Sequence, residues 1–257
     1  MPKWNPFPYD SQPYRYDIAR LRQCWPELHR GDCEALPDDE GLLNAWSAYH
    51  AGDFQKAVKL ADEVGLSAHA VANKASGIYA NYLEEDEKRQ IELFQQAIAR
   101  AEDAIEAFPD DPNAHYFHAF NLGRYSQSIS VVKAVKQGYA GKIRDSLENA
   151  LRLQPRHAEA HTAMGLYHAE IIDKMGKLIG SMTYGASEAE SIKHLETALS
   201  LTPDAPIANI EYANGLYLLY GDKRIDEVTD FYIKASELEP HDAMECLDIE
   251  YAKSELE

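Results

Sequence analysis

The sequence has few cysteines and no long apolar run. Its three cysteines are Cys24, Cys33 and Cys246, too few for the disulfide framework of a small secreted protein. We expect packed thiols, although Cys24 and Cys33 could pair in an exported protein. No stretch approaches the roughly 20 apolar residues of a membrane-spanning helix, and residues 1–10 do not resemble a signal peptide. We therefore expect a cytoplasmic protein without a membrane span, or a periplasmic one if a signal has been removed.

Positive charge is also scarce. The chain has 25 lysines and arginines against 43 acidic residues, a net charge of −18. Nucleic acids bind mainly through lysine and arginine, and an anionic membrane surface repels an acidic protein. We therefore expect no nucleic-acid partner. The acidic residues crowd toward the C-terminus, where they could meet a basic partner or form a solvated face that favours solubility.

Catalytic motifs are missing as well. The sequence contains no GxxxxGK phosphate loop, no GxSxG and no HExxH motif. His157, His161 and His168 share one face of a predicted helix, and two histidines at i and i+4 can bind zinc. Packing against a neighbouring helix explains the same spacing. We predict no enzyme activity, metal or cofactor, and a metal-dependent enzyme that uses this face is retained as an alternative.

A repeating pattern replaces these motifs. Four segments place a small residue five positions before a proline; the small residues are Ala104, Ala150, Ala198 and Ala235. Such a pattern resembles the end of the second helix of a tetratricopeptide repeat, where proline stops the helix. The intervals exceed the plain repeat of about 34 residues. Two repeats therefore carry insertions, and the last is nearly standard.

Small residues recur on the first helices of these units. Gly77, Gly165 and Gly215 occupy equivalent positions, where two helices must approach closely. No alternating strand pattern is present. The sequence therefore predicts an all-α fold, a right-handed α-solenoid of tetratricopeptide-like helical hairpins with insertions. We expect an arm with a short helix at 1–38, about five hairpins at 39–240 and a capping helix at 241–257.

The order of the insertions resembles one family. Residues 114–125, 143–171, 174–191 and 248–256 look like the regulator of microtubule dynamics proteins and related bacterial tetratricopeptide proteins. The similarity begins near Glu87 and covers about two-thirds of the chain. A more distant similarity is to the T-component of TRAP transporters. The resemblance implies an interaction module, and it brings no catalytic residues.

The first helices are expected to line a concave groove. Polar and aromatic side chains on them suit an extended peptide, because an amide offers both donors and an acceptor. They are Asn73, Asn81, Tyr116, Asn121, Arg124, Asn214 and Tyr217. Ordinary hydrogen bonding between helices is the other interpretation. We therefore predict a protein-interaction scaffold that binds a peptide or protein segment, with a small-ligand accessory of a transport system as the alternative.

Two further segments could contact partners. The N-terminal arm alternates prolines with Trp4, Phe7, Tyr9, Tyr14 and Tyr16, so it should be extended. We expect it to pack on its own chain rather than on a second subunit, because exposed aromatic residues at this density would associate. An insertion has an apolar face that could cover the core or pair in a homo-oligomer; its residues are Ile171, Ile172, Met175, Leu178, Ile179 and Met182.

Overall fold

The computed structural model describes residues 3–129 and 131–257, and every regular element in these two ranges is helical. The chain divides into two compact units. Unit 1 comprises the residues up to His29, Glu34–Leu153 and Asp242–Met244, and unit 2 comprises Arg30–Cys33, Gln154–His241 and Glu245–Glu257. Within the described ranges, no helix combines the length and apolar character that crossing a membrane requires. The predicted division into arm, repeats and cap remains a prediction.

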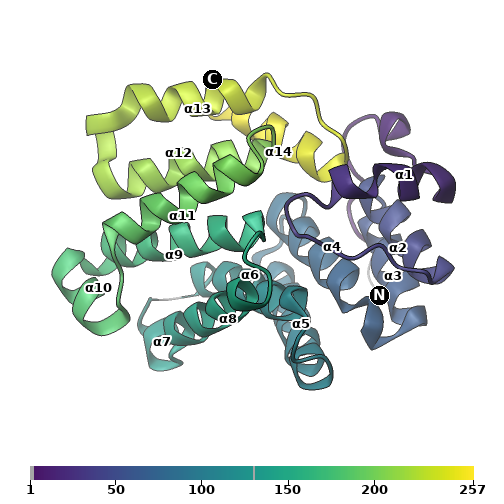
Figure 1. Ribbon diagram of the computed structural model, residues 1–257, viewed down its shortest axis with the longest axis horizontal. Helices are drawn as coiled ribbons and strands as arrows, with labels where there is room; N and C mark the ends of the chain where they lie inside the picture. Colours follow the sequence, from purple (N-terminus) through teal and green to yellow (C-terminus); the bar gives the residue numbers. More distant parts are fainter. Residues whose placement is uncertain (1–2, 130) are drawn as a thin grey trace. The chain divides into compact units, whose positions relative to one another are not determined.

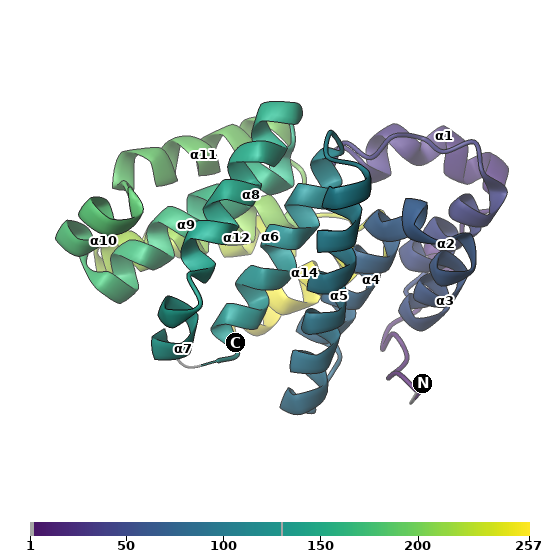
Figure 2. The ribbon, with the colours of Figure 1, turned by 90° about the horizontal axis from the view of Figure 1, so that it is seen from below.

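Unit 1 is a series of helical hairpins. Its helices are α1 (Ile18–Leu28), α2 (Glu40–His50), α3 (Phe54–Val64), α4 (His69–Tyr82), α5 (Glu87–Ala107), α6 (Pro112–Gln127), α7 (Val131–Lys136) and α8 (Tyr139–Leu153), with short 3-10 turns at Gln12–Tyr14 and Leu66–Ala68. The pairs α2/α3, α4/α5 and α6/α8 form the hairpins, and α7 is an insertion in the third. The helix α5 packs on both α4 and α6, and the three lie side by side (Figure 2).

Aspartate caps set where several of these helices begin. The side chains of Asp39, Asp86 and Asp111 each accept a hydrogen bond from a backbone N–H in the first turn of α2, α5 and α6, respectively. Each cap satisfies a donor that the helix itself leaves unpaired. Pro112 follows Asp111 at the first helical position, where its missing N–H costs nothing.

Unit 2 repeats the hairpin plan. Its helices are α9 (Ala158–Met175), α10 (Lys177–Tyr184), α11 (Glu188–Leu201), α12 (Pro206–Tyr220), α13 (Ile225–Ser236) and the larger part of α14 (Ala243–Ser254), with a 3-10 turn at Gly221–Arg224. The pairs α9/α11 and α12/α13 form hairpins, as Figure 1 shows, and α10 is an insertion that folds back on α9. Ser187 caps α11 by accepting from the Glu190 backbone N–H.

The recurrent glycines lie at helix contacts, which confirms their predicted role. A Cβ atom on Gly77 of α4 would lie 2.5 Å from the ring of Phe120 on α6. A Cβ on Gly165 of α9 would lie 2.5 Å from Leu195 on α11, and one on Gly215 of α12 would also collide with Leu195. Leu195 is 1% exposed, so α11 inserts its side chain between two glycine surfaces.

The N-terminal arm packs on helices of unit 1, which confirms the prediction that the arm packs on its own chain. Trp4 stacks on Tyr79 of α4 with ring centroids 4.1 Å apart. The Asn5 backbone N–H donates to the Tyr79 hydroxyl at 3.0 Å. Tyr14 and Tyr16 are also buried. The arm therefore contributes to the core of its own unit.

The apolar side chains of the α10 insertion, unlike those of the N-terminal arm, are exposed. Leu178, Ile179 and Met182 on α10 are exposed by 73%, 54% and 81%. These three side chains do not cover the core of unit 2. Pairing of this face with a second copy remains a prediction.

Candidate functional site

The seven predicted groove residues divide by burial. Asn73, Tyr116 and Asn121 are buried, and Asn73 Oδ1 accepts from Arg100 Nη1 at 3.0 Å. Asn121 Nδ2 donates to the Phe117 carbonyl at 2.9 Å. The Asn73–Arg100 bond joins α4 to α5, as the alternative of hydrogen bonding between helices expects, whereas the Asn121–Phe117 bond lies within α6. A partner lying on the surface would not reach these three side chains directly.

The other four residues are accessible to different extents. Asn81 at the end of α4 and Tyr217 on α12 are exposed, and Arg124 is half-buried on α6. The Arg124 guanidinium lies 5.8 Å from the centre of the Phe120 ring. Asn214 is half-buried, donates to Glu211 at 2.8 Å and accepts from the Tyr232 hydroxyl at 2.6 Å. Peptide binding by Asn81, Arg124 and Tyr217 stays a prediction.

The predicted histidine face is not one cluster. His157 is fully buried and caps α9, because its Nδ1 accepts from the Ala160 N–H at 3.1 Å. His161 instead faces His194 of α11, with 2.8 Å between their Nδ1 atoms, and the His168 ring stacks near His194 at 6.2 Å. Across the described residues, no group of three or more His, Cys, Asp or Glu side chains is arranged to hold a metal. Sequence reasoning missed His194, which lies beyond the α10 insertion.

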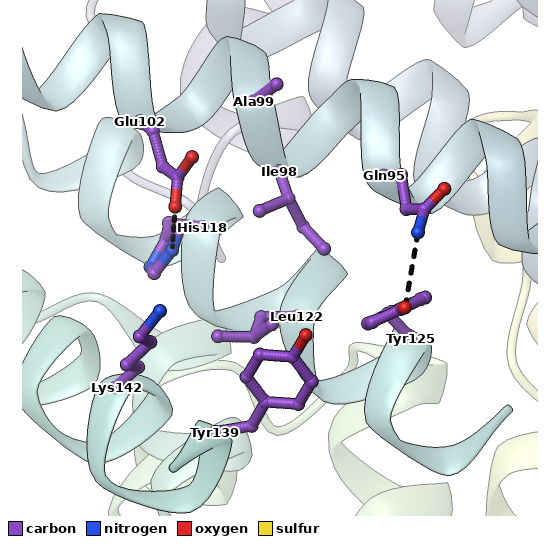
Figure 3. Close-up of a pocket in the computed structure, with 9 residues that line it drawn as sticks. All are labelled: Gln95, Ile98, Ala99, Glu102, His118, Leu122, Tyr125, Tyr139 and Lys142. Carbon is purple, nitrogen blue, oxygen red and sulfur yellow. Dashed lines mark hydrogen bonds and ion pairs between the residues drawn. The ribbon is translucent and has the colours of Figure 1, made fainter. Parts of the chain in front are cut away.

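A pocket of about 180 Å³ lies in unit 1 between α5, α6 and α8 (Figure 3). It is lined by Gln95, Ile98, Ala99, Glu102, His118, Leu122, Tyr125, Tyr139 and Lys142. On each helix the lining residues recur three or four positions apart, which places them on one face. That spacing was available in the sequence, but it is also the spacing of an ordinary solvated helix face. None of the seven predicted residues lines this pocket.

One end of the pocket is aromatic. The rings of Tyr125 and Tyr139 meet edge to face with centroids 5.8 Å apart. Gln95 Nε2 and Lys133 Nζ donate to the Tyr125 hydroxyl at 3.2 Å and 3.4 Å. Burial, together with the charge and the hydrogen bond of the neighbouring Tyr125, raises the pKa of Tyr139, so the Tyr139 hydroxyl keeps its proton at neutral pH and directs it toward Tyr125.

The other end is charged (Figure 3). His118 Nδ1 hydrogen-bonds the Ser146 hydroxyl at 2.8 Å, and its Nε2 lies 3.8 Å from Glu102 Oε1. Burial lowers the pKa of His118, Glu102 opposes this effect and Lys142 adds to it, so the imidazole is neutral at pH 7. Within the part of the chain that the structure describes, Lys142 forms no ion pair. Its ammonium group lies 5.8 Å from the centre of the Tyr139 ring and can still donate hydrogen bonds to a ligand.

The contact between Ser146 and His118 resembles part of a catalytic dyad, but its placement does not suit catalysis. Ser146 is buried and does not line the pocket. A nucleophile must reach the substrate atom that it attacks. The hydroxyl serves instead to fix the His118 ring between α6 and α8.

The model of one protein family, regulator of microtubule dynamics protein 1-3, matches residues 44–244. The chain belongs to this family. The match confirms the family resemblance that the order of insertions indicates. It begins at residue 44, whereas the resemblance found in the sequence begins near Glu87. None of the curated proteins matches the sequence.

A solved structure supports the fold of this family member. A thermophilic TPR protein from Thermus thermophilus is similar over 85% of this chain and 98% of its own, with a TM-score of 0.59 and 19% identity. The likeness confirms the all-α, tetratricopeptide-like solenoid. A fold of this kind, in this family, is typical of a protein-interaction scaffold rather than of an enzyme.

Proposed function

We propose that the protein is an interaction scaffold, and that a partner anchors one side chain in the pocket between α5, α6 and α8. The observation that carries the proposal is the placement of Lys142, which has no ion-pair partner among the described residues, beside two tyrosines in a recess of about 180 Å³. Pockets for small molecules usually measure about 300–1,000 Å³. The recess therefore suits one inserted side chain better than a free ligand or cofactor, which argues against the transport-accessory alternative.

The lining indicates which side chain fits. Ile98 and Leu122 supply an apolar floor, and Tyr139 offers a ring for stacking. Lys142 is a donor, so the tip of the inserted group should carry an oxygen acceptor. A carboxylate would meet Glu102 and the net charge of −18. A neutral tyrosine of the partner segment satisfies all of these conditions, and tyrosine is a frequent anchor at interfaces.

The first-helix surface predicted from the sequence is the competing location for the same function. Its accessible members are Asn81 and Arg124 in unit 1 and, separately, Tyr217 in unit 2. An extended peptide bound there would use side-chain amides and the guanidinium rather than a pocket. The two locations lie on different helix faces, so substitutions can separate them.

The test uses peptides selected from a random library on the full chain, with affinities measured by fluorescence polarisation. Ala99 is exposed at the pocket wall, so Ala99→Phe should fill the recess without disturbing the core. We expect the loss of an anchor worth about 2 kcal/mol, or roughly thirtyfold in Kd. Lys142→Met should weaken binding by a smaller factor, because it removes only the donor.

The matched control is Ala107→Phe, which adds the same ring at an exposed alanine of the same helix. It should leave binding unchanged. Asn81→Ala and Arg124→Ala complete the set. If the selected peptides lack tyrosine, or bind Ala99→Phe as well as the unmodified chain, the pocket is not the anchor site. Loss of binding only in Asn81→Ala and Arg124→Ala would move the site to the first helices.

A further inference from the structure

Two histidines of unit 2 face one another across a hairpin. His161 on α9 and His194 on α11 are both partly exposed, with 2.8 Å between their Nδ1 atoms. His161 Nε2 lies 3.1 Å from the Pro155 carbonyl oxygen. His194 Nε2 lies 4.0 Å from Glu190 Oε2. The two Nδ1 atoms thus face each other across the hairpin, and each Nε2 atom has an oxygen acceptor on its own side.

Hydrogen bonding fixes the tautomer of His161. A carbonyl oxygen only accepts, so Nε2 of His161 must carry the hydrogen and Nδ1 must hold a lone pair. His194 then has to donate from its own Nδ1 to complete the contact at 2.8 Å. If the His194 proton moves to Nε2, where the Glu190 carboxylate is the nearby acceptor, the two Nδ1 lone pairs face each other, and a rotation of both rings turns them toward a common ion. No net proton is gained or lost in this change.

This arrangement is the one found around metal-ligating histidines. Such a histidine nearly always donates its second ring N–H to a carbonyl or a carboxylate, which orients the ring and increases its basicity. Pro155 has that role for His161. The Glu190 carboxylate lies 4.0 Å from His194 Nε2, so its side chain would have to move closer to take the same role. Glu190 also accepts from Lys193 at 3.0 Å, so its carboxylate is charged and held in place.

We propose that His161 and His194 bind a divalent transition-metal ion through their Nδ1 atoms, with water completing the coordination sphere. The ion links the two helices of the α9/α11 hairpin. This binding does not depend on the proposed interaction function. It also differs from the histidine face predicted from the sequence, because His157 is committed to capping α9.

The separation of the two nitrogens indicates which metal fits. Metal–nitrogen bonds of about 2.0–2.1 Å place two ligands about 2.9 Å apart at a right angle and about 3.3 Å apart in a tetrahedron. The 2.8 Å of the hydrogen-bonded pair is nearer to the right-angle value, so a right-angle site would change the separation of the two nitrogens least. Square-planar and tetragonal nitrogen sites are typical of Cu²⁺ and Ni²⁺, and Cu²⁺ binds most tightly in the divalent series. We expect the order Cu²⁺, then Ni²⁺, then Zn²⁺.

The surroundings are compatible with a loaded site. Burial, and then the neighbouring His161 and His168, lower the pKa of His194 to about 4, so the ring is neutral at pH 7, as a ligand must be. The His194 side chain is 17% exposed, which leaves access for water on the ion. Lys193 is the nearby opposing charge, and its ammonium group is paired with Glu190.

The direct test is titration of the tag-free full chain with Cu²⁺, Ni²⁺ and Zn²⁺ salts, followed by calorimetry. His161→Gln and His194→Gln should each weaken Cu²⁺ binding at least about tenfold. The matched control is His241→Gln, which removes another partly exposed histidine of unit 2 and should leave the affinity unchanged. Equal affinity in either test variant and the unmodified chain would overturn the proposal.

A second measurement needs no substitution. Electron paramagnetic resonance of the Cu²⁺-loaded protein should show hyperfine splitting from two equatorial imidazole nitrogens. A spectrum with one nitrogen, or with none, would refute the site even if the variants fail to fold. Far-UV circular dichroism of the metal-free variants shows whether each keeps its helices.

Discussion

Adding one methyl group at Gly165 should test how the hairpins pack. In Gly165→Ala the new Cβ would lie 2.5 Å from Leu195 Cγ and 3.1 Å from the Ser191 carbonyl oxygen. The leucine can adjust slightly, but the carbonyl belongs to the α11 backbone. The Ser191 hydroxyl also donates to the Gly165 carbonyl at 2.7 Å, so separating α9 from α11 would lengthen a buried hydrogen bond.

These contacts set the magnitude. Overpacking a core costs about 1–3 kcal/mol, and replacing glycine by alanine inside a helix returns up to about 1 kcal/mol. Because the hydrogen bond resists separation, we expect Gly165→Ala to lower the free energy of unfolding by about 1–2 kcal/mol. Urea titration followed by circular dichroism at 222 nm measures this change.

The control is Gly123→Ala on α6, where nothing lies within 4 Å of the new Cβ. It should stabilise the protein by about 0.5–1 kcal/mol. Leu195→Ala alone should cost about 2–5 kcal/mol. The double variant with Gly165→Ala should lose less free energy of unfolding than the sum of the two single losses, because the new Cβ no longer collides with the leucine. Equal effects of Gly165→Ala and Gly123→Ala would refute the packing argument.

Two further predictions concern unit 1. Burial alone would raise the pKa of Asp111, but hydrogen bonds from His69 and the backbone outweigh it and lower the pKa. Asp111→Asn keeps a helix cap, so at pH 7 it should lower the free energy of unfolding by only about 1 kcal/mol. This loss should be full above pH about 4 and should disappear as the pH falls through the lowered pKa of Asp111. A loss that does not change with pH in urea titrations would contradict this. Trp4→Ala should release the arm and speed trypsin cleavage at Arg15, whereas Tyr9→Ala, at a 42% exposed residue, should leave the cleavage rate unchanged.

The hairpins were predictable because their signals are local. Prolines after the second helices act on the adjacent turn, and the glycines recur at one position of each unit, so spacing alone locates both. The environment of a polar side chain is different. Asn121 is buried against Gly77, where a Cβ atom would lie 2.8 Å from the Asn121 Oδ1. This fit depends on how α4 and α6 are aligned. The sequence does not encode that alignment as a period.

The sequence does not reveal the residues of the two proposed sites for the same reason: each site depends on how separate helices are aligned. His161 and His194 lie on opposite sides of the α10 insertion, so no spacing rule connects them. The pocket in unit 1 also needs three helices in register. Its residues, such as Ala99 and Lys142, look like an ordinary solvated face when each helix is considered alone. Sequence patterns identify the face on which a residue lies, whereas a site depends on which faces meet.

This difference explains why both proposed sites involve second helices. Every residue of α4 from His69 to Ala80 is buried, because a first helix packs on its own partner and on neighbouring first helices. Its polar groups must then be satisfied inside the stack. The helix α5 buries a single stripe and leaves its other face in water. The second helix α5 therefore offers more polar groups to a partner than α4 does, and substitutions on α4 should alter stability before they alter binding.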